Sequence, residues 1–153
     1  MITKLTPEQV SSFWDVIKYA IEESLPPTVD DHPDKMNRIL TSLLCSQMDC
    51  WASYEVNEDN RKFDGLMVTK ILYDNSSDTK SLLIYCIYSY ESASRKSWEA
   101  GTRSILKYAK YNKCSKIIAY TEVPSIIDWA KRIGAEATYT FLSFNVNELM
   151  EKV

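Results

Sequence analysis

The amino-acid sequence predicts a mixed α/β fold, in which a central sheet is covered by helices. In the N-terminal part, apolar residues recur at the spacing of amphipathic helices, and three runs with strand character follow. A strand, a long helix and a second strand come next, and this order predicts a crossover joining two parallel strands. The chain of 153 residues is expected to form a single domain, residues 1–153, with a continuous core.

Start and stop signals in the sequence predict the first helix. Residues 2–5 form a possible edge strand, and Thr6-Pro7-Glu8-Gln9 then has the form of a capping box with proline at the first helical position. Pro26-Pro27 ends this helix. Its apolar face consists of Val10, Phe13, Trp14, Ile17 and Ile21.

A polar loop and a second helix follow. Asp30, Asp31, His32 and Asp34 could be imagined as a metal site, but we favour a solvated loop that caps the next helix, and we expect no metal. The apolar face of the second helix consists of Ile39, Leu40, Leu43 and Leu44. We expect this helix to end near Met48.

Three strands are expected next, over residues 50–56, 63–73 and 79–90, as an antiparallel meander. The segment from Ser81 to Tyr88 is almost continuously apolar or aromatic. Such a run is typical of a central strand covered on both faces.

In the C-terminal third of the chain, helices and strands are expected to alternate. A helix is expected over residues 97–112, with an apolar stripe of Trp98, Ile105, Leu106 and Ala109. A buried strand over residues 116–122 and a short helix that Gly134 closes come next. Residues 139–146 are expected to form a last, aromatic strand.

Composition and charge exclude several classes of protein. A net charge of −3 argues against a general nucleic-acid binder, and no apolar run is long enough to span a membrane. The N-terminus lacks the pattern of a signal peptide. The four cysteines form no CxxC pair, so we expect reduced, structural thiols and a cytoplasmic protein.

The order of elements resembles the GNAT superfamily of acetyl-CoA-dependent N-acetyltransferases. Two short motifs carry the resemblance in sequence. Arg95-Lys96-Ser97-Trp98-Glu99-Ala100 looks like the family's pyrophosphate motif Gln/Arg-x-x-Gly-x-Gly/Ala, and Ala130-Lys131-Arg132-Ile133-Gly134-Ala135 resembles its Tyr-Glu-Lys-Leu-Gly-Phe ending. The resemblance implies a mixed sheet with two N-terminal helices, a long crossover helix and a short C-terminal helix.

The family also implies a site. Coenzyme A would lay its pyrophosphate on the N-terminus of the long helix, so Arg95, Lys96, Ser97, Trp98, Glu99 and Ala100 are the candidate cofactor-binding residues. The pantetheine arm and an amine would meet where the central strands splay. The candidate catalytic residues are Glu122, Tyr120 and Tyr88.

Several residues depart from the family pattern. Trp98 replaces the middle glycine of the pyrophosphate motif, Ala130 stands at the position of a proton-donating tyrosine, and Val123 replaces a frequent asparagine. The preferred interpretation is therefore a protein with a degraded acetyl-CoA site that no longer catalyses transfer, with no cofactor and with a protein partner or self-association. Its size and composition resemble those of small GNAT-like proteins of tailed bacteriophages, some of which are carried in the virion.

Two alternatives stay open. The first is an active acetyl-CoA-dependent N-acetyltransferase with a divergent pyrophosphate loop and an amine acceptor. The second is an unrelated α/β protein-interaction module that uses its ten tyrosines and four tryptophans.

Overall fold

The computed structural model describes residues 1–58, 60–90 and 94–153. The chain divides into two compact units, Met1–Ala119 and Tyr120–Val153. None of the helices in the described ranges is long and apolar enough to cross a membrane.

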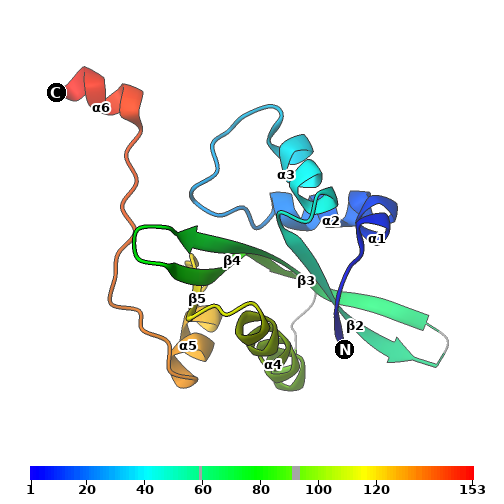
Figure 1. Ribbon diagram of the computed structural model, residues 1–153. Helices are drawn as coiled ribbons and strands as arrows, with labels where there is room; N and C mark the ends of the chain where they lie inside the picture. Colours follow the sequence, from blue (N-terminus) through cyan, green and yellow to red (C-terminus); the bar gives the residue numbers. More distant parts are fainter. Residues whose placement is uncertain (59, 91–93) are drawn as a thin grey trace. The chain divides into compact units, whose positions relative to one another are not determined.

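The first unit is built on a five-stranded sheet whose strands lie side by side in chain order (Figure 1). The strands are β1 (Ile2–Lys4), β2 (Asp49–Asn57), β3 (Asn60–Asp74), β4 (Thr79–Ser89) and β5 (Lys116–Ala119). Strands β1 to β4 pair with one another in antiparallel fashion, and β5 pairs with β4 in parallel. The predicted meander, the central position of the third long strand and the parallel pair are confirmed.

Three short helices lie between β1 and β2 in the chain, one more than the sequence predicted. They are α1 (Pro7–Ser12), α2 (Trp14–Glu22) and α3 (Lys35–Leu44). Thr6 and Gln9 form the predicted capping box. The predicted first helix is broken at Phe13, whose backbone leaves the helical region with φ −104° and ψ 17°. Ser11 and Ser12 precede the break, and serine favours helix ends over helix interiors.

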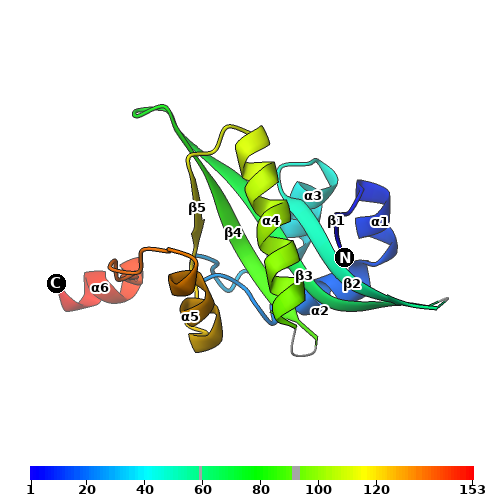
Figure 2. The same cartoon turned by 90° about the horizontal axis from the view of Figure 1, so that it is seen from below.

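Helices α1–α3 cover one face of the sheet, and α4 (Arg95–Tyr111) covers the other (Figures 1 and 2). The chain therefore has a core on each face. The core under α1–α3 includes Val10, Ile17, Ile21, Ala52 and Val68. The core under α4 includes Trp51, Met67, Leu82, Ile105 and Ala109. The predicted stripe of α4 is partly wrong, because Leu106 is exposed and Tyr108 takes its place against the sheet.

The second unit contains α5 (Pro124–Arg132) and α6 (Val146–Lys152). Gly134 ends α5 at a φ of +102°, and its N–H bonds to the carbonyl oxygen of Lys131, so the predicted role of this glycine is confirmed. The predicted strand over residues 139–146 is wrong: residues 135–145 are irregular, and α6 begins at Val146. A strand needs a hydrogen-bonded neighbour, and none pairs with this segment within the described part of the chain.

Candidate functional site

The N-terminus of α4 carries the residues that the sequence singled out for cofactor binding. Ser94 is the N-cap, and its Oγ accepts a hydrogen bond of 3.2 Å from the N–H of Ser97. Arg95, Lys96 and Ser97 form the first turn of the helix, which begins two residues before the predicted start at residue 97. The N–H groups of Arg95 and Lys96 have no partner inside the helix, because the first turn of any α-helix lacks them. The positive end of a helix of 17 residues therefore faces outward here.

A row of ion pairs runs along the exposed side of this helix. Arg95 Nε donates to Glu99 Oε1 at 3.0 Å, and Arg103 lies 3.9 Å from the other oxygen of Glu99. The cation expected to meet a pyrophosphate is thus already paired with a carboxylate of its own helix. Lys96 is exposed next to it.

Trp98 follows the first turn and is half-buried. It precedes Ile105 by seven residues, so helical periodicity places the two residues on the same side of α4. The Oγ1 of Thr102 donates a hydrogen bond of 2.8 Å to the carbonyl oxygen of Trp98. Trp98 thus stands just after the first turn of α4, where the resemblance puts the middle glycine of the pyrophosphate motif.

Strand β4 has a bulge at the point where β5 leaves it. Val68 of β3 pairs with Cys86 and Thr69 with Ile84, so Tyr85 is the extra residue. The same Ile84 makes the last pair with β5, at Ala119. Beyond it, β4 continues to Ser89, and no β5 residue pairs with this part in the described ranges (Figure 2). β5 thus ends level with the bulge of β4.

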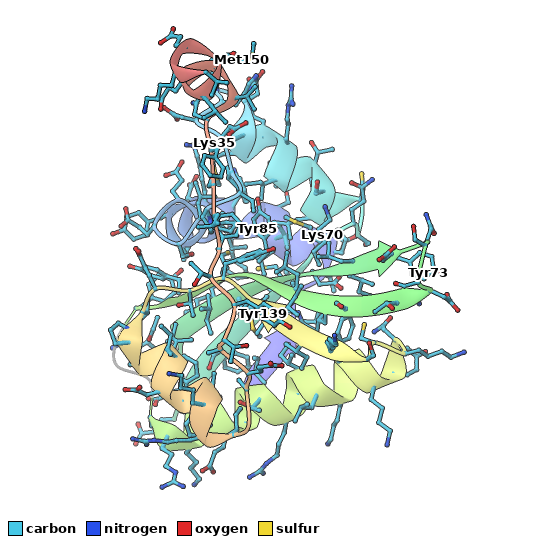
Figure 3. The ribbon with its side chains drawn as sticks, turned by 90° about the vertical axis from the view of Figure 1, so that its left-hand side faces the viewer. Lys35, Lys70, Tyr73, Tyr85, Tyr139 and Met150 are labelled. Atoms are coloured by element: carbon cyan, nitrogen blue, oxygen red, sulfur yellow. The ribbon has the colours of Figure 1, made fainter. Side chains whose placement is uncertain are left out.

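The bulge places Tyr85 and Cys86 on the same face, against the core under α1–α3. Figure 3 shows Tyr85 between the sheet and these helices. The extra residue of a bulge leaves the regular ladder, so its backbone N–H can be offered to a ligand. Sequence patterns did not reveal this position, because a strand is expected to alternate its side chains.

Tyrosines gather around the end of β4. The ring of Tyr88 lies 6.0 Å from that of Tyr19 on α2 and 5.0 Å from that of Tyr90. The hydroxyl of Tyr90 donates to the carbonyl oxygen of Val16 at 3.3 Å. Tyr88, a candidate catalytic residue, is therefore packed in an aromatic cluster that includes Tyr19, a residue that the sequence did not single out.

These phenols favour the protonated form. The hydrogen bond with Tyr19 raises the pKa of Tyr88, and burial raises the pKa of Tyr85. Burial, with Tyr88 and Cys50 nearby, raises the pKa of Tyr90 to about 12. At neutral pH the cluster offers hydrogen-bond donors and no base.

Thiol chemistry is disfavoured in the core. Burial raises the pKa of Cys50 to about 12 and that of Cys86 to about 11. All four cysteines are free thiols. Because the thiolate is the reactive form, Cys50 and Cys86 are structural residues.

The other two candidate catalytic residues belong to the second unit. Glu122 is exposed, and Tyr120 is 40% exposed with its ring 5.1 Å from that of Phe141. Ala130 lies on α5, and Val123 is the N-cap of this helix. Of the predicted site residues, Arg95–Ala100 thus lie together on α4, and Tyr88 lies on β4. Tyr120 and Glu122 belong to the second unit.

Two further features bear on ligands. Within the described residues, no group of three metal-ligating side chains gathers, and His32 Nδ1 accepts a hydrogen bond of 3.1 Å from the N–H of Asp34.

A cavity of about 190 Å³ lies beside β1, α1 and the end of α3, lined among others by Lys4, Thr6 and Asp49. It is smaller than the roughly 300 Å³ at which ligand pockets begin.

Solved structures resemble the whole architecture. A ribosomal-protein-alanine N-acetyltransferase from Brucella melitensis biovar Abortus 2308 superposes with a TM-score of 0.66 at 14% identity, over 95% of this chain and 99% of that one. A predicted acetyltransferase from Clostridium acetobutylicum, solved with acetyl-CoA, gives a TM-score of 0.66 at 16% identity, over 97% of both chains.

A third similar structure is an aminoglycoside antibiotic 6′-N-acetyltransferase from Acinetobacter baumannii, with a TM-score of 0.64 at 16% identity, over 95% of this chain and 96% of that one. In sequence, the chain matches no family model and no curated protein. These likenesses establish the fold, which is that of the GNAT acetyltransferases.

Proposed function

We propose that this chain is a GNAT-fold binding or structural protein that does not catalyse acetyl transfer. The observation that carries the proposal is Trp98, a half-buried indole at the position where the family's pyrophosphate motif has its middle glycine. That glycine lets phosphates approach the backbone closely, because it has no side chain. A side chain as large as an indole at this position would occupy the space that this approach needs.

The electrostatics of the helix start support the same proposal. Glu99 lies 3.0 Å from the guanidinium of Arg95 and neutralises the cation that a pyrophosphate would use. Ser94 already occupies the N–H of Ser97. The Ser97 N–H and the Arg95 charge are therefore less available to an anion, while the N–H groups of Arg95 and Lys96 keep no partner inside the helix.

The expected proton donor is also missing. Ala130, at the position of the family's tyrosine, has no proton to give to a departing thiolate. The remaining tyrosine candidate in the first unit, Tyr88, is packed against Tyr19 and Tyr90.

A second candidate function, an active acetyl-CoA-dependent N-acetyltransferase, is favoured by one feature. The bulge at Tyr85 stands where β4 and β5 part, and it frees a backbone N–H that could stabilise a thioester carbonyl. In that case Arg95 to Ala100 would bind acetyl-CoA, and Glu122 would take the proton of the amine, with Tyr120 or Tyr88 assisting.

Calorimetric titration of acetyl-CoA separates the two functions. Wild-type protein is expected to show no binding at micromolar concentration, and Trp98→Gly is expected to gain it. Trp98→Phe is the matched control, because it keeps an aromatic ring and should gain nothing. Micromolar binding by the wild type would reject the non-catalytic proposal. Circular dichroism should accompany each titration, since glycine in a helix costs about 1 kcal/mol.

The proposal extends to a component of a bacteriophage particle. This extension rests on the resemblance to small GNAT-like phage proteins. The test is quantitative mass spectrometry of purified particles of the source phage. It is expected to detect the chain in the particles at a copy number comparable to those of other structural proteins. Its presence only in the lysate supernatant would reject the extension.

A further inference from the structure

The two helical layers of the first unit carry opposite charges. Residues 94–119, which contain α4 and β5, include seven basic residues and one acidic residue, a net charge of +6. Residues 7–44, which contain α1, α2 and α3, include three basic and seven acidic residues, a net charge of −4. Helix α4 covers one face of the sheet, and the other three helices cover the opposite face (Figures 1 and 2). The first unit therefore has a basic side and an acidic side.

The outer side of α4, which we name the basic face, carries four exposed cations and one exposed apolar side chain. It lies opposite Ile105, which is buried against the sheet. Figure 3 shows nitrogen-tipped side chains of α4 that point away from the sheet. Leu106 is 53% exposed, and none of the ion pairs in the described part of the chain involves Lys107 or Lys110. The basic face consists of Lys96, Arg103, Leu106, Lys107 and Lys110.

The outer side of α2, which we name the acidic face, has the same pattern with the opposite charge. The side of this helix away from the buried Ile17 carries three exposed carboxylates and two large side chains. Val16 is 43% exposed, and Tyr19 is 52% exposed. Glu22 lies 4.0 Å from Lys18, at the rim of this face. The acidic face consists of Asp15, Val16, Tyr19, Glu22 and Glu23.

We propose that copies of this chain associate head to tail, with the basic face of one copy on the acidic face of the next. Each face has charges around exposed apolar or aromatic side chains, and interfaces between proteins have such an apolar centre and polar rim. Opposite charges on the two faces steer the encounter and fix its register. One copy cannot bring its own two faces together, because the sheet lies between α2 and α4. The chain itself supplies the complementary surface, so the partner is a second copy.

The positions of the two faces determine the kind of assembly. The contact uses a different surface on each copy, so it is heterologous and not twofold. Each copy that is added leaves one basic face and one acidic face unpaired at the two ends. The contact therefore grows into an open chain of copies or closes into a ring.

The association does not rest on the proposed function. Titration of acetyl-CoA reports on Trp98 and the first turn of α4, whereas the association uses the outer sides of α4 and α2. A protein that binds acetyl-CoA and still associates would reject only the proposed function. A protein that binds no acetyl-CoA and stays monomeric would reject only the association.

Light scattering of the full chain at two ionic strengths tests the attraction. At about 0.01 M, where the Debye length is about 30 Å, the average mass is expected to rise with protein concentration above the chain mass of 17.7 kDa. At about 1 M, where the Debye length is about 3 Å, the mass should return to that of a monomer. A monomer under both conditions, or a mass that does not fall with salt, would overturn the proposal.

Charge reversal on either face should prevent the association. The first variant combines Lys107→Glu with Lys110→Glu, and the second combines Glu22→Lys with Glu23→Lys. In each variant the two faces carry charges of the same sign. The dissociation constant at low ionic strength should therefore rise roughly a hundredfold or more, because like charges placed opposite one another are strongly unfavourable.

Two control variants change the net charge by the same amounts outside both faces. Lys70→Glu with Lys152→Glu matches the first variant, and Glu136→Lys with Glu151→Lys matches the second. Lys70 lies on β3, and the other three residues belong to the second unit. Both controls should associate like the wild type, so a loss of association in them would show that net charge alone is responsible.

An equimolar mixture of the two charge-reversed variants distinguishes this contact from any other. The acidic α4 of the first variant is complementary to the basic α2 of the second, and their unchanged faces are complementary as well. The mixture should therefore regain the wild-type mass, although each variant alone is monomeric. A mixture that stays monomeric, or an association that only one of the two reversals prevents, would contradict the head-to-tail contact.

Circular dichroism of each variant should match that of the wild type. If a double variant does not fold, the single substitutions Lys107→Glu and Glu23→Lys repeat the comparison and the mixture with smaller changes of charge.

Discussion

The hydroxyl group of Tyr108 on α4 donates a hydrogen bond to the carboxylate of Asp49 on β2. Trp51 packs edge-on against the same ring at 5.0 Å, and the Lys4 ammonium lies 5.5 Å from its centroid. Lys4 also lies 3.8 Å from Asp49. This group of residues joins β1, β2 and α4 on one face of the sheet, so it fixes the helix that carries the candidate site.

Replacement of Tyr108 by phenylalanine should destabilise the protein by about 1–2 kcal/mol, because Asp49 loses a hydrogen bond in a partly buried place. Urea unfolding at pH 7 measures the change. Tyr111→Phe is the matched control on the same helix, since Tyr111 is 85% exposed, and it should have no effect. Equal stability of the two variants would contradict a structural role for the Tyr108–Asp49 contact.

Stability should fall steeply above about pH 10, the ordinary pKa of tyrosine. Burial and then the hydrogen bond to Asp49 raise the pKa of Tyr108, and burial raises that of Tyr90 to about 12. Above pH 10 the unfolded chain releases protons that the folded chain retains, so the free energy of unfolding decreases. The stabilising contribution of these two phenols is complete below their pKa in the unfolded chain. It is lost as the pH rises through their higher pKa in the folded chain.

The test is urea unfolding between pH 8.5 and 11.5. The decrease should be smaller for Tyr108→Phe than for the wild type, whereas Tyr111→Phe should follow the wild type. Parallel curves for wild type and Tyr108→Phe would show that this phenol does not contribute.

Two glycine substitutions should have opposite effects. A Cβ at Gly65 would lie 3.2 Å from the carbonyl oxygen of Tyr88, so Gly65→Ala should destabilise the β3–β4 pair by about 1 kcal/mol. A Cβ at Gly101 would meet only Ile2 Cδ1, at an ordinary 3.8 Å. Gly101→Ala should therefore stabilise α4 by about 0.5–1 kcal/mol through helix propensity.

Thermal unfolding of the two alanine variants, compared with the wild type, measures both effects. A midpoint that does not fall for Gly65→Ala would contradict the close approach of β3 to β4 at this glycine, and a midpoint that falls for Gly101→Ala would contradict the open space at Gly101.

The four cysteines should separate by reactivity. Cys45 is exposed, so it should react rapidly with an aromatic disulfide reagent at pH 8. Cys50 and Cys86 are buried with pKa values of about 12 and 11, so they should react only when the protein unfolds. Cys45→Ser should remove the fast phase. Rapid modification of Cys50 or Cys86 in the native protein, located by peptide mapping, would contradict their structural role.

Local signals in the sequence predicted most of the first unit and the end of α5 in the second. The capping box at Thr6, the apolar run of Ser81 to Tyr88 and the closing Gly134 each act through the nearest few residues, and each stands where it was expected. The start of α4 was predicted within two residues for the same reason. The break at Phe13 was missed, because a continuous apolar face extends across it.

Contacts between distant residues decided the rest. Leu106 and Tyr108 both extend the apolar pattern of α4, and only the presence of Trp51 and Asp49 on β2 selects Tyr108. The bulge at Tyr85 depends on the register of β3 against β4, which no local pattern encodes. Tyr19 joins the site because α2 packs over the end of β4.

The sequence by itself determined the order of helices and strands from β2 to α5 and placed Trp98 near the start of the long helix, since these features follow from periodicity and capping. Only the tertiary structure decided where β5 stops pairing with β4, which tyrosines surround the end of β4, and that residues 139–145 lack a strand partner within the described chain. Strand pairing is a relation between segments far apart in sequence, and its hydrogen bonds exist only when both partners are in place.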